Sequence, residues 1–201
     1  MKILLATQNI HKVEELRLFM SQFGHEVLTL NDFPEIDEII EDGETLEANA
    51  LLKARAGFAA TGLPTIADDT GLEVDALNGA PGVYSARYAG DNVTYDDNVN
   101  KLLQEMQSIN DNERNARFVT VVVFLDSEHE FLARGVVLGE ITKQRIGDSG
   151  FGYDPVFRVL EKNKTYAQMS LEEKNQLSHR GRAMSLLTDK LMKNHKSFSA
   201  E

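Results

Sequence analysis

The chain has 201 residues, with 21 lysines and arginines against 32 aspartates and glutamates, which gives a formal net charge of −11. This negative charge opposes binding to phosphate backbones and anionic membranes, so we expect no nucleic-acid polymer and no membrane as partner. The absence of cysteine excludes disulfide scaffolds, thiolate metal sites and cysteine nucleophiles, and a hydrophobic fraction of 42% is too high for a disordered chain.

The apolar segments are too short for a membrane span or a secretory signal. The most apolar run, Val119–Leu125, is far below the roughly 20 residues of a spanning helix. The N-terminal run Ile3–Ala6 reaches polar residues before it attains the roughly 7–15 residues of a signal-peptide core. We therefore expect a cytoplasmic protein.

The first third of the chain has a β–α–β pattern. Residues 3–6 and 26–30 predict buried strands, and the apolar positions from Val13 to Phe23 recur with helical spacing. This order favours a parallel pair of strands joined by a right-handed crossover. A second helix is expected from about 44 to 60, followed by a short strand at 64–67.

The remainder of the chain alternates helical and extended patterns. Residues 116–126 and 130–141 predict an antiparallel hairpin. Helix starts are expected at three capping sequences and before a final amphipathic segment: Thr94-x-x-Asp97, Thr165-x-x-Gln168, Ser170-x-x-Glu173 and residues 183–192. No stretch has the composition of a linker, so we predict one mixed α/β domain covering residues 1–201.

The acidic pair Asp68-Asp69 is the strongest local signal for chemistry. Adjacent carboxylates repel each other, and a fold tolerates them best beside a cation. Hard oxygen ligands suit Mg²⁺, and a carboxylate can also act as a general base. A tight turn that ends at Gly71 explains the same residues equally well.

A second acidic feature lies upstream, because residues 31–47 hold eight acids and no lysine or arginine. Most of such a run is expected to be a solvated face. Glu41 is the exception that we single out, since the following Asp42-Gly43 turn can direct its side chain inward.

Residues 7–12 connect the first strand to the first helix. The free backbone N–H groups of a helix start bind phosphate well, and Lys12 adds positive charge. The alternative is a plain helix cap by Asn9. Neither the P-loop pattern nor the dinucleotide-binding glycine pattern occurs in the chain.

Two C-terminal motifs fit the recognition of a base. Residues 151–155 combine two aromatic side chains with an acid, which suits stacking and hydrogen bonding to a ring, although a hydrophobic plug is the alternative. His179 and Arg180 offer donors for a purine oxygen, or simply mark the start of a helix.

The motifs form one ordered set. It comprises Thr7-x-Asn9-x-x-Lys12, Glu41 with Glu47-Ala-Asn49-Ala-x-x-Lys53, Ala67-Asp-Asp-Thr-Gly71, Gly79-Ala-Pro-Gly-x-Tyr-Ser-Ala-Arg87, Gly150-Phe-Gly-Tyr-Asp-Pro155 and Ser178-His-Arg180. In content and order, over nearly the whole chain, the set closely resembles the inosine triphosphate pyrophosphatase family, which hydrolyses non-standard purine nucleoside triphosphates.

This resemblance implies a fold, an assembly and a reaction. The fold would be elongated α/β, a mixed sheet flanked by helices with a cleft between two lobes, and the protein would be a homodimer. The reaction would be the Mg²⁺-dependent hydrolysis of XTP, ITP and dITP to the nucleoside monophosphate and pyrophosphate, which cleanses the nucleotide pool.

The resemblance also implies roles for individual residues. Glu41 and Asp69 would bind the metal, and Asp69 would also accept a proton from the attacking water. The substrate would be held by Thr7, Gln8, Asn9, Ile10, His11, Lys12, Lys53, Thr70, Phe151, Gly152, Tyr153, Asp154, Lys174, His179 and Arg180.

The sequence departs from the family pattern at three of these positions and leaves two other functions open. Gln8 and His11 stand where glycine is usual, and Thr70 stands where serine is common. The alternatives are a Maf-like nucleotide pyrophosphatase with another base preference and a non-catalytic nucleotide sensor with the same pocket.

Overall fold

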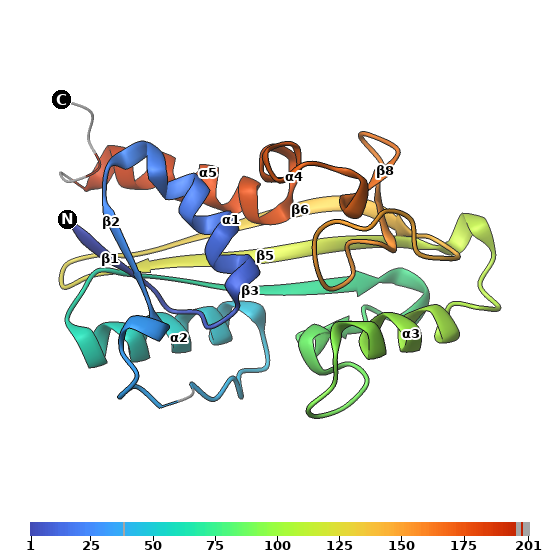
Figure 1. The fold of residues 1–201 in the computed structure, drawn as a ribbon, viewed down its shortest axis with the longest axis horizontal. Coiled ribbons are helices and arrows are strands. Elements are labelled where there is room, and N and C mark those ends of the chain that lie inside the picture. Colours follow the sequence, from blue (N-terminus) through green and yellow to red (C-terminus); the bar gives the residue numbers. More distant parts are fainter. Residues whose placement is uncertain (38, 196–197, 199–201) are drawn as a thin grey trace. The chain divides into compact units, whose positions relative to one another are not determined.

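The computed structural model describes residues 1–37, 39–195 and 198. Glu38, one of the acids of the 31–47 stretch, lies outside the described residues. The fold is mixed α/β, as predicted, with five α-helices among the described residues and one mixed sheet (Figure 1). The strand order is β2-β1-β3-β5-β6-β7-β8, and β4 pairs with β3 off this path.

The elements follow the predicted order. The helices are α1 (Ile10–Met20), α2 (Leu46–Thr61), α3 (Tyr95–Glu105), α4 (Leu171–Leu177) and α5 (His179–Asn194). The strands are β1 (Lys2–Leu5), β2 (Glu26–Thr29), β3 (Thr65–Val74), β4 (Pro81–Gly82), β5 (Asn115–Leu125), β6 (Glu130–Ile141), β7 (Phe157–Val159) and β8 (Lys164–Thr165). No helix among the described residues is long and apolar enough to cross a membrane.

By its internal contacts the chain divides into two compact units. Unit 1 holds Met1–Asp69, Thr120–Gly135 and the residues from His179 onward, and unit 2 holds Thr70–Val119 and Val136–Ser178. The chain passes from one unit to the other inside β3, β5 and β6 and once more just before α5. Most of these crossings lie inside β-strands, so no linker-like composition marks the boundary between the units.

Unit 1 is built on the β–α–β arrangement that the sequence predicts. Strand β1 pairs in parallel with both β2 and β3. Helices α1 and α5 lie on one side of these strands and α2 on the other (Figure 1). Alternate strand residues face the α1–α5 side, where they pack with both helices in a core that includes Ile3, Leu5, Leu16, Met20, Ile66, Val122, Phe124, Met184, Leu187 and Leu191.

Unit 2 has its own core around α3. This helix begins at the predicted capping box, in which the Asp97 N–H donates to Thr94 Oγ1 at 3.2 Å and the Thr94 N–H donates to Asp97 Oδ2 at 2.8 Å. Its apolar face packs against strand residues and an aromatic group, with a core that includes Leu72, Val74, Val99, Leu102, Met106, Phe118, Val137, Phe157 and Tyr166.

Two local predictions are wrong. The Thr165-x-x-Gln168 sequence forms a capping box, but it opens only the 3₁₀ turn Tyr166–Gln168 instead of a helix. The strand expected at 64–67 runs from Thr65 to Val74, so the acidic pair and Gly71 lie inside β3 and form no turn. Strand pairing therefore overrides the turn preference of the Asp–Asp–Thr–Gly sequence.

Candidate functional site

The two aspartates of β3 face opposite sides of the strand in unit 1. Successive residues of a β-strand point to opposite faces, and the contacts of the pair follow that rule. The Asp68 carboxylate is 3.2 Å from Lys12 Nζ of α1, whereas the Asp69 carboxylate is 3.4 Å from Lys53 Nζ of α2. The repulsion expected between adjacent acids is thus relieved by separate cations on the two faces.

The Asp69 face gathers two acids around one ammonium group. Lys53 Nζ lies 2.9 Å from Glu41 Oε2 and 3.4 Å from Asp69 Oδ1. Lys53 and Asp69 are buried, while the Glu41 side chain is 35% exposed and gives the cluster its open side. The structure therefore brings together the predicted metal ligands Glu41 and Asp69 with the predicted substrate-binding lysine.

Asn49 connects the loop of Glu41 to the same carboxylate. Its side-chain amide donates to Asp69 Oδ2 at 3.3 Å, and its carbonyl oxygen accepts the backbone N–H of Gly43 at 2.8 Å. A Cβ at position 43 would lie 2.6 Å from Asn49 Oδ1, so this close approach requires glycine. The arrangement holds Glu41 near Asp69 through a buried amide.

Burial dominates the electrostatics of this cluster. Burial raises the pKa of Asp69 above its usual range, because the loss of hydration outweighs the attraction of Lys53. Burial alone would lower the pKa of Lys53, but Asp69 and Glu41 outweigh it and raise that pKa. The ammonium group therefore keeps its proton, and the Asp69 carboxylate is a stronger base than an exposed aspartate.

The donor set of this cluster fits a divalent cation of the magnesium class. Glu41 and Asp69 direct carboxylate oxygens at one point that the Lys53 ammonium group occupies as a cation. Carboxylate oxygens are the hard ligands that Mg²⁺ prefers, and Mg²⁺ is usually bound by one or two of them together with substrate phosphates.

The Asp68 face is a closed ion-pair network. Asp68 is fully buried, and its Oδ2 atom accepts from Arg180 Nε at 3.1 Å as well as contacting Lys12. Arg180 Nη1 donates to the carboxylate of Glu15, which is also buried. Burial alone would raise the pKa of Asp68, but Lys12 and Arg180 outweigh it and hold that pKa far below its usual range.

The same network determines the state of its two cations. Desolvation lowers the pKa of Lys12 more than the nearby Asp68 raises it. Arg180 shows the opposite balance, since the attraction of Asp68 and Glu15 exceeds the effect of burial and raises its pKa. Arg180 thus pairs with two buried acids of unit 1, Asp68 and Glu15. Its role in recognising the purine base of the substrate stays a prediction.

The loop of residues 7–12 matches the helix-cap alternative. Asn9 precedes α1, and its Oδ1 atom accepts the backbone N–H groups of His11 at 3.1 Å and Lys12 at 3.4 Å. Thr7 Oγ1 accepts the N–H of Asn9 at 3.2 Å. Gln8 and Ile10 are exposed. Two N–H groups considered for phosphate are therefore engaged by the cap, while Gln8 and Ile10 stay open to solvent.

His179 is the first residue of α5 and lies buried in unit 1. Its Nδ1 atom is 2.6 Å from Thr120 Oγ1, which fixes the orientation of the ring. The hydroxyl of Thr120 is a polar group inside the apolar part of β5, residues 118–125. This contact orients His179, and the substrate-binding role stays a prediction.

Unit 2 holds a second cluster, at Phe151, Asp154 and Lys174. Lys174 Nζ lies 2.6 Å from Asp154 Oδ2 and 4.5 Å from the centre of the Phe151 ring. Asp154 Oδ2 also accepts the N–H of Phe151 at 2.8 Å, and a Cβ on Gly150 would overlap this carboxylate. Three of the predicted nucleoside-pocket residues therefore form one charged and aromatic group.

The remaining predicted residues of unit 2 have varied surroundings. Tyr153 is buried and donates from its hydroxyl to the carbonyl oxygen of Ser85 at 3.0 Å, and burial raises its pKa. Gly152 has a φ of +58°, and Thr70 is a half-buried residue of β3. The Tyr153 hydroxyl thus joins the loop of residues 151–155 to Ser85. The position of Thr70 alone indicates no role.

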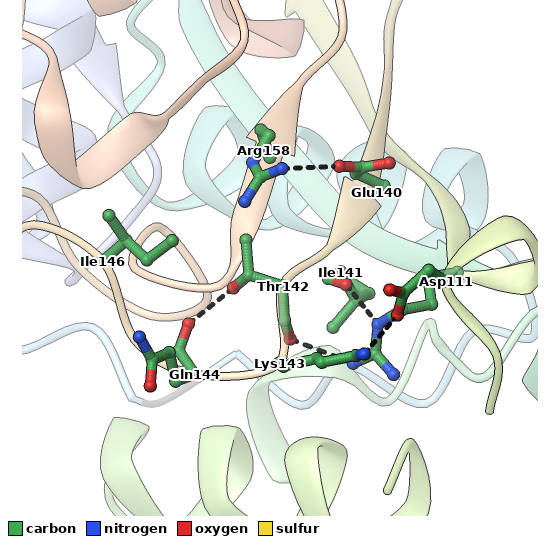
Figure 2. A pocket seen from close by; sticks show the side chains of 9 residues that line it. Asp111, Glu140, Ile141, Thr142, Lys143, Gln144, Ile146 and Arg158 are labelled. Carbon is green, nitrogen blue, oxygen red and sulfur yellow. Dashed lines mark hydrogen bonds and ion pairs between the residues drawn. The ribbon is translucent and has the colours of Figure 1, made fainter. Parts of the chain in front are cut away.

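A pocket of about 430 Å³ in unit 2 involves none of the predicted residues (Figure 2). Its charged side chains pair with one another or with backbone carbonyls. Lys143 contacts Asp111, Arg158 contacts Glu140, and Arg114 donates to the carbonyls of Ile141 and Thr142. These partners already satisfy the charged side chains of the lining, so we assign this pocket no role.

Sequence reasoning gave no role to three residues that support the site, although it named Asn49 within one of the motifs. Asn49 is a buried amide within an alanine-rich helix, and Thr120 is a hydroxyl within a strongly apolar run. A single polar residue in an apolar segment is the sequence signal by which each could have been found. Glu15 is a buried acid between the core residues Val13 and Leu16. Nothing in the sequence distinguishes Glu15 from a surface acid, because its partner Arg180 is distant in the chain.

The fold and the site define a mixed α/β protein with a carboxylate–ammonium cluster, and comparisons with known proteins specify the family. A family model described as the Ham1 family matches residues 3–190. The dITP/XTP pyrophosphatase of Vibrio cholerae serotype O1 is 48% identical over 189 residues, which are 92% of this chain and 94% of the relative. That of Escherichia coli K12 is 45% identical over 193 residues, 94% and 98% of the two chains.

The solved structures agree with this result. The structure of a HAM1 protein from Coxiella burnetii has a TM-score of 0.86 and 37% identity, and the match covers 96% of this chain and 99% of that one. The chain belongs to the Ham1 family.

Proposed function

We propose that this protein hydrolyses non-standard purine nucleoside triphosphates, XTP, ITP and dITP, to the nucleoside monophosphate and pyrophosphate. Membership of the Ham1 family and the high identity to relatives named dITP/XTP pyrophosphatase support this reaction. The single observation that carries it in this chain is the Glu41–Lys53–Asp69 cluster, which is open at Glu41 and held together by Asn49.

We propose that Glu41 and Asp69 hold Mg²⁺. When bound, the ion would supply positive charge that offsets the phosphate oxygens beside the acids. Lys53 carries a charge in the same cluster because its pKa is raised, so its ammonium group can neutralise a further oxygen. The donor chemistry of the two carboxylates supports this assignment.

Asp69 is the residue that we propose to accept the proton. A water oxygen forms the new bond to the α-phosphorus, the bond from that phosphorus to the bridging oxygen breaks, and pyrophosphate leaves. The proton of the water passes to the Asp69 carboxylate. The position of this carboxylate beside Glu41 and Lys53 supports the role, because a positioned carboxylate can take the proton of an attacking water.

The Phe151–Asp154–Lys174 group of unit 2 is our candidate for binding the nucleoside. A purine ring can stack on Phe151, whose ring is only half-buried and also lies 5.9 Å from that of Tyr95. The Lys174 ammonium group and the Asp154 carboxylate offer a donor and an acceptor for ring edges. A donor that faces O6 disfavours adenine, whose amino group would leave both donors unpaired.

The test is pyrophosphate release in the presence of Mg²⁺ from ITP, XTP, dITP, GTP, ATP and dUTP. We expect rapid release from the first three substrates, and none above background when EDTA replaces Mg²⁺. Release from a different base only would support the Maf-like alternative, and nucleotide binding without any product would support the sensor. The family comparisons favour neither alternative.

We further propose that the protein is a homodimer and acts in the cytoplasm. The family resemblance supports the dimer, and the nucleotide substrate and the net charge of −11 support an aqueous compartment with free nucleotides. Light scattering during gel filtration tests the first proposal: a mass of twice 22.5 kDa is expected, and a single-chain mass would contradict it. Cell fractionation tests the second.

A further inference from the structure

Unit 1 contains a second group of metal-ligating side chains, formed by Asp126, His129 and His195. Asp126 directly follows β5, His129 precedes β6 in the same hairpin turn, and His195 follows the last residue of α5. One possible ligand atom from each residue lies within 4.8 Å of the other two. All three side chains are half-buried, so the group stays accessible from solvent.

The contacts between the three residues converge on the Asp126 carboxylate. Its Oδ2 atom lies 2.7 Å from His195 Nε2, and its Oδ1 atom lies 3.3 Å from His129 Nδ1. The imidazole rings of His129 and His195 have centroids 5.2 Å apart. Each histidine therefore turns a ring nitrogen toward the Asp126 carboxylate. His129 does so from the start of β6 and His195 from the end of α5.

The surroundings hold these side chains in place. Asp126 Oδ1 accepts the backbone N–H groups of Glu128 at 2.8 Å and His129 at 2.7 Å, which fixes the carboxylate in the turn. The His129 ring stacks on Phe131 at 5.4 Å, and the His195 ring meets Phe124 edge-on at 5.4 Å. Because this packing already restricts the side chains, they would lose less conformational entropy on binding a metal ion.

The ligand set differs in kind from that of the Glu41–Asp69 cluster. Two imidazole nitrogens and one carboxylate are borderline ligands that suit Zn²⁺, Ni²⁺ or Cu²⁺, whereas Mg²⁺ prefers oxygen alone. A tetrahedral zinc ion lies about 2.0–2.2 Å from nitrogen and carboxylate ligands, and three protein ligands leave one position for water. The present separations allow this geometry after small rotations of the side chains.

We propose that Asp126, His129 and His195 form a binding site for a divalent transition-metal ion of the zinc class. The ion would join the end of α5 to the β5–β6 turn and replace the contacts that the two histidines now make with Asp126. Its role would be to hold the end of α5 at the β5–β6 turn within unit 1, independently of the hydrolytic reaction.

The test compares Zn²⁺ binding to the wild type, His129→Gln, His195→Gln and the control His25→Gln by titration calorimetry on the full chain. His25 is a suitable control because it contacts Phe198, which also packs on His195, but contributes no ligand. We expect one Zn²⁺ per chain, affinity at least about tenfold weaker in either ligand variant, and little change in the control. Zn²⁺ should also raise the unfolding midpoint of the wild type and the control only.

Two further measurements keep the proposal open to contradiction. Asp69→Asn should bind Zn²⁺ like the wild type, and a loss of binding there would assign the ion to the Glu41–Asp69 cluster and overturn the proposal. Equal affinity in the wild type and both histidine variants would overturn it too. If either variant fails to fold in EDTA, the Cu²⁺ electron paramagnetic resonance spectrum of the wild type decides: coupling to two imidazole nitrogens supports the site, and oxygen ligands alone contradict it.

Discussion

Asp68 and Asp69 are neighbours in the sequence, yet β3 turns them to opposite faces of unit 1, where their surroundings differ. On the α1–α5 face, Asp68 is paired with Lys12 and Arg180, and its pKa is lowered. On the α2 face, Asp69 shares Lys53 with Glu41, and its pKa is raised. Asp68 contacts two cations, whereas Asp69 shares the one lysine that it contacts with a second acid.

This difference shows how one acidic pair can serve structure and chemistry at once. A fully compensated carboxylate stabilises the fold but is a poor base, because its partners hold it in the ionised form. An undercompensated carboxylate costs stability but takes up a proton or a cation readily. The face of the strand, and not the local sequence, decides which of the two an aspartate becomes.

Replacing Asp69 by asparagine should have the largest effect on activity. We expect kcat for pyrophosphate release to fall about 10²–10⁴-fold, because the proton acceptor is lost while the shape of the side chain is kept. The measurement is steady-state release from ITP with saturating Mg²⁺, with the far-UV circular dichroism spectrum as a check of folding. A kcat near that of the wild type would remove Asp69 from the reaction.

Replacing Asp68 by asparagine should have the largest effect on stability. We expect the free energy of unfolding to fall by about 3–5 kcal/mol, since Lys12 and Arg180 lose a buried countercharge. Urea unfolding at pH 7 measures this value. The matched control is Asp189→Asn on the exposed side of α5, which should change stability by less than about 0.5 kcal/mol. An equal loss in the two variants would contradict the account.

The pH dependence of stability should separate the two aspartates by sign. The lowered pKa of Asp68 stabilises the fold above the unfolded value of about 3.9, and this contribution is lost as the pH falls toward the folded pKa. The raised pKa of Asp69 has the opposite effect: its ionisation costs stability as the pH rises past the same unfolded value.

At pH 7, Asp68→Asn should therefore be less stable than the wild type, and Asp69→Asn equal to it or more stable. Both differences should shrink as the pH is lowered toward 3. Urea midpoints for the three proteins at several pH values between 3 and 7 test this expectation. Two differences of the same sign at pH 7 would show that the faces of β3 are electrostatically alike.

Removing the cap of α1 should have the smallest effect. Asn9→Ala loses the acceptor for the N–H groups of His11 and Lys12, which should cost about 1 kcal/mol of stability. The first turn of α1 places Lys12 beside Asp68, so a small part of the stability contributed by Asp68 should also be lost. The kcat of Asn9→Ala should stay close to that of the wild type, because the Asp69 face is unchanged. A fall in kcat as large as that caused by Asp69→Asn would show that the two faces of β3 are coupled.

The sequence predicted most elements because their signals are local. The capping box at Thr94, the hairpin of β5 and β6 and the helical spacing of α1 depend on neighbouring residues only. The length of β3 did not follow from the sequence, since the turn preference of its Asp–Asp–Thr–Gly part is overcome by pairing with distant strands. The opposite orientation of the two aspartates was missed for the same reason.

The candidate site was predictable in part. Glu41, Lys53 and Asp69 were identified from the family resemblance, and the structure places them together. Glu15 was missed because its role depends on Arg180, which is far along the chain. The resemblance implied two lobes, but the boundaries of the two units were not predictable from composition, because the chain crosses between them mostly inside strands that carry no mark of a boundary.

The most direct test of this account measures kcat and the free energy of unfolding on the same preparations of the wild type, Asp68→Asn and Asp69→Asn at pH 7. We predict that Asp69→Asn loses turnover and keeps its stability, whereas Asp68→Asn loses stability and, at a temperature where it is folded, keeps kcat within about tenfold of the wild type. The reverse pattern, or a parallel loss of both properties in both variants, would contradict the division of roles between the two faces of β3.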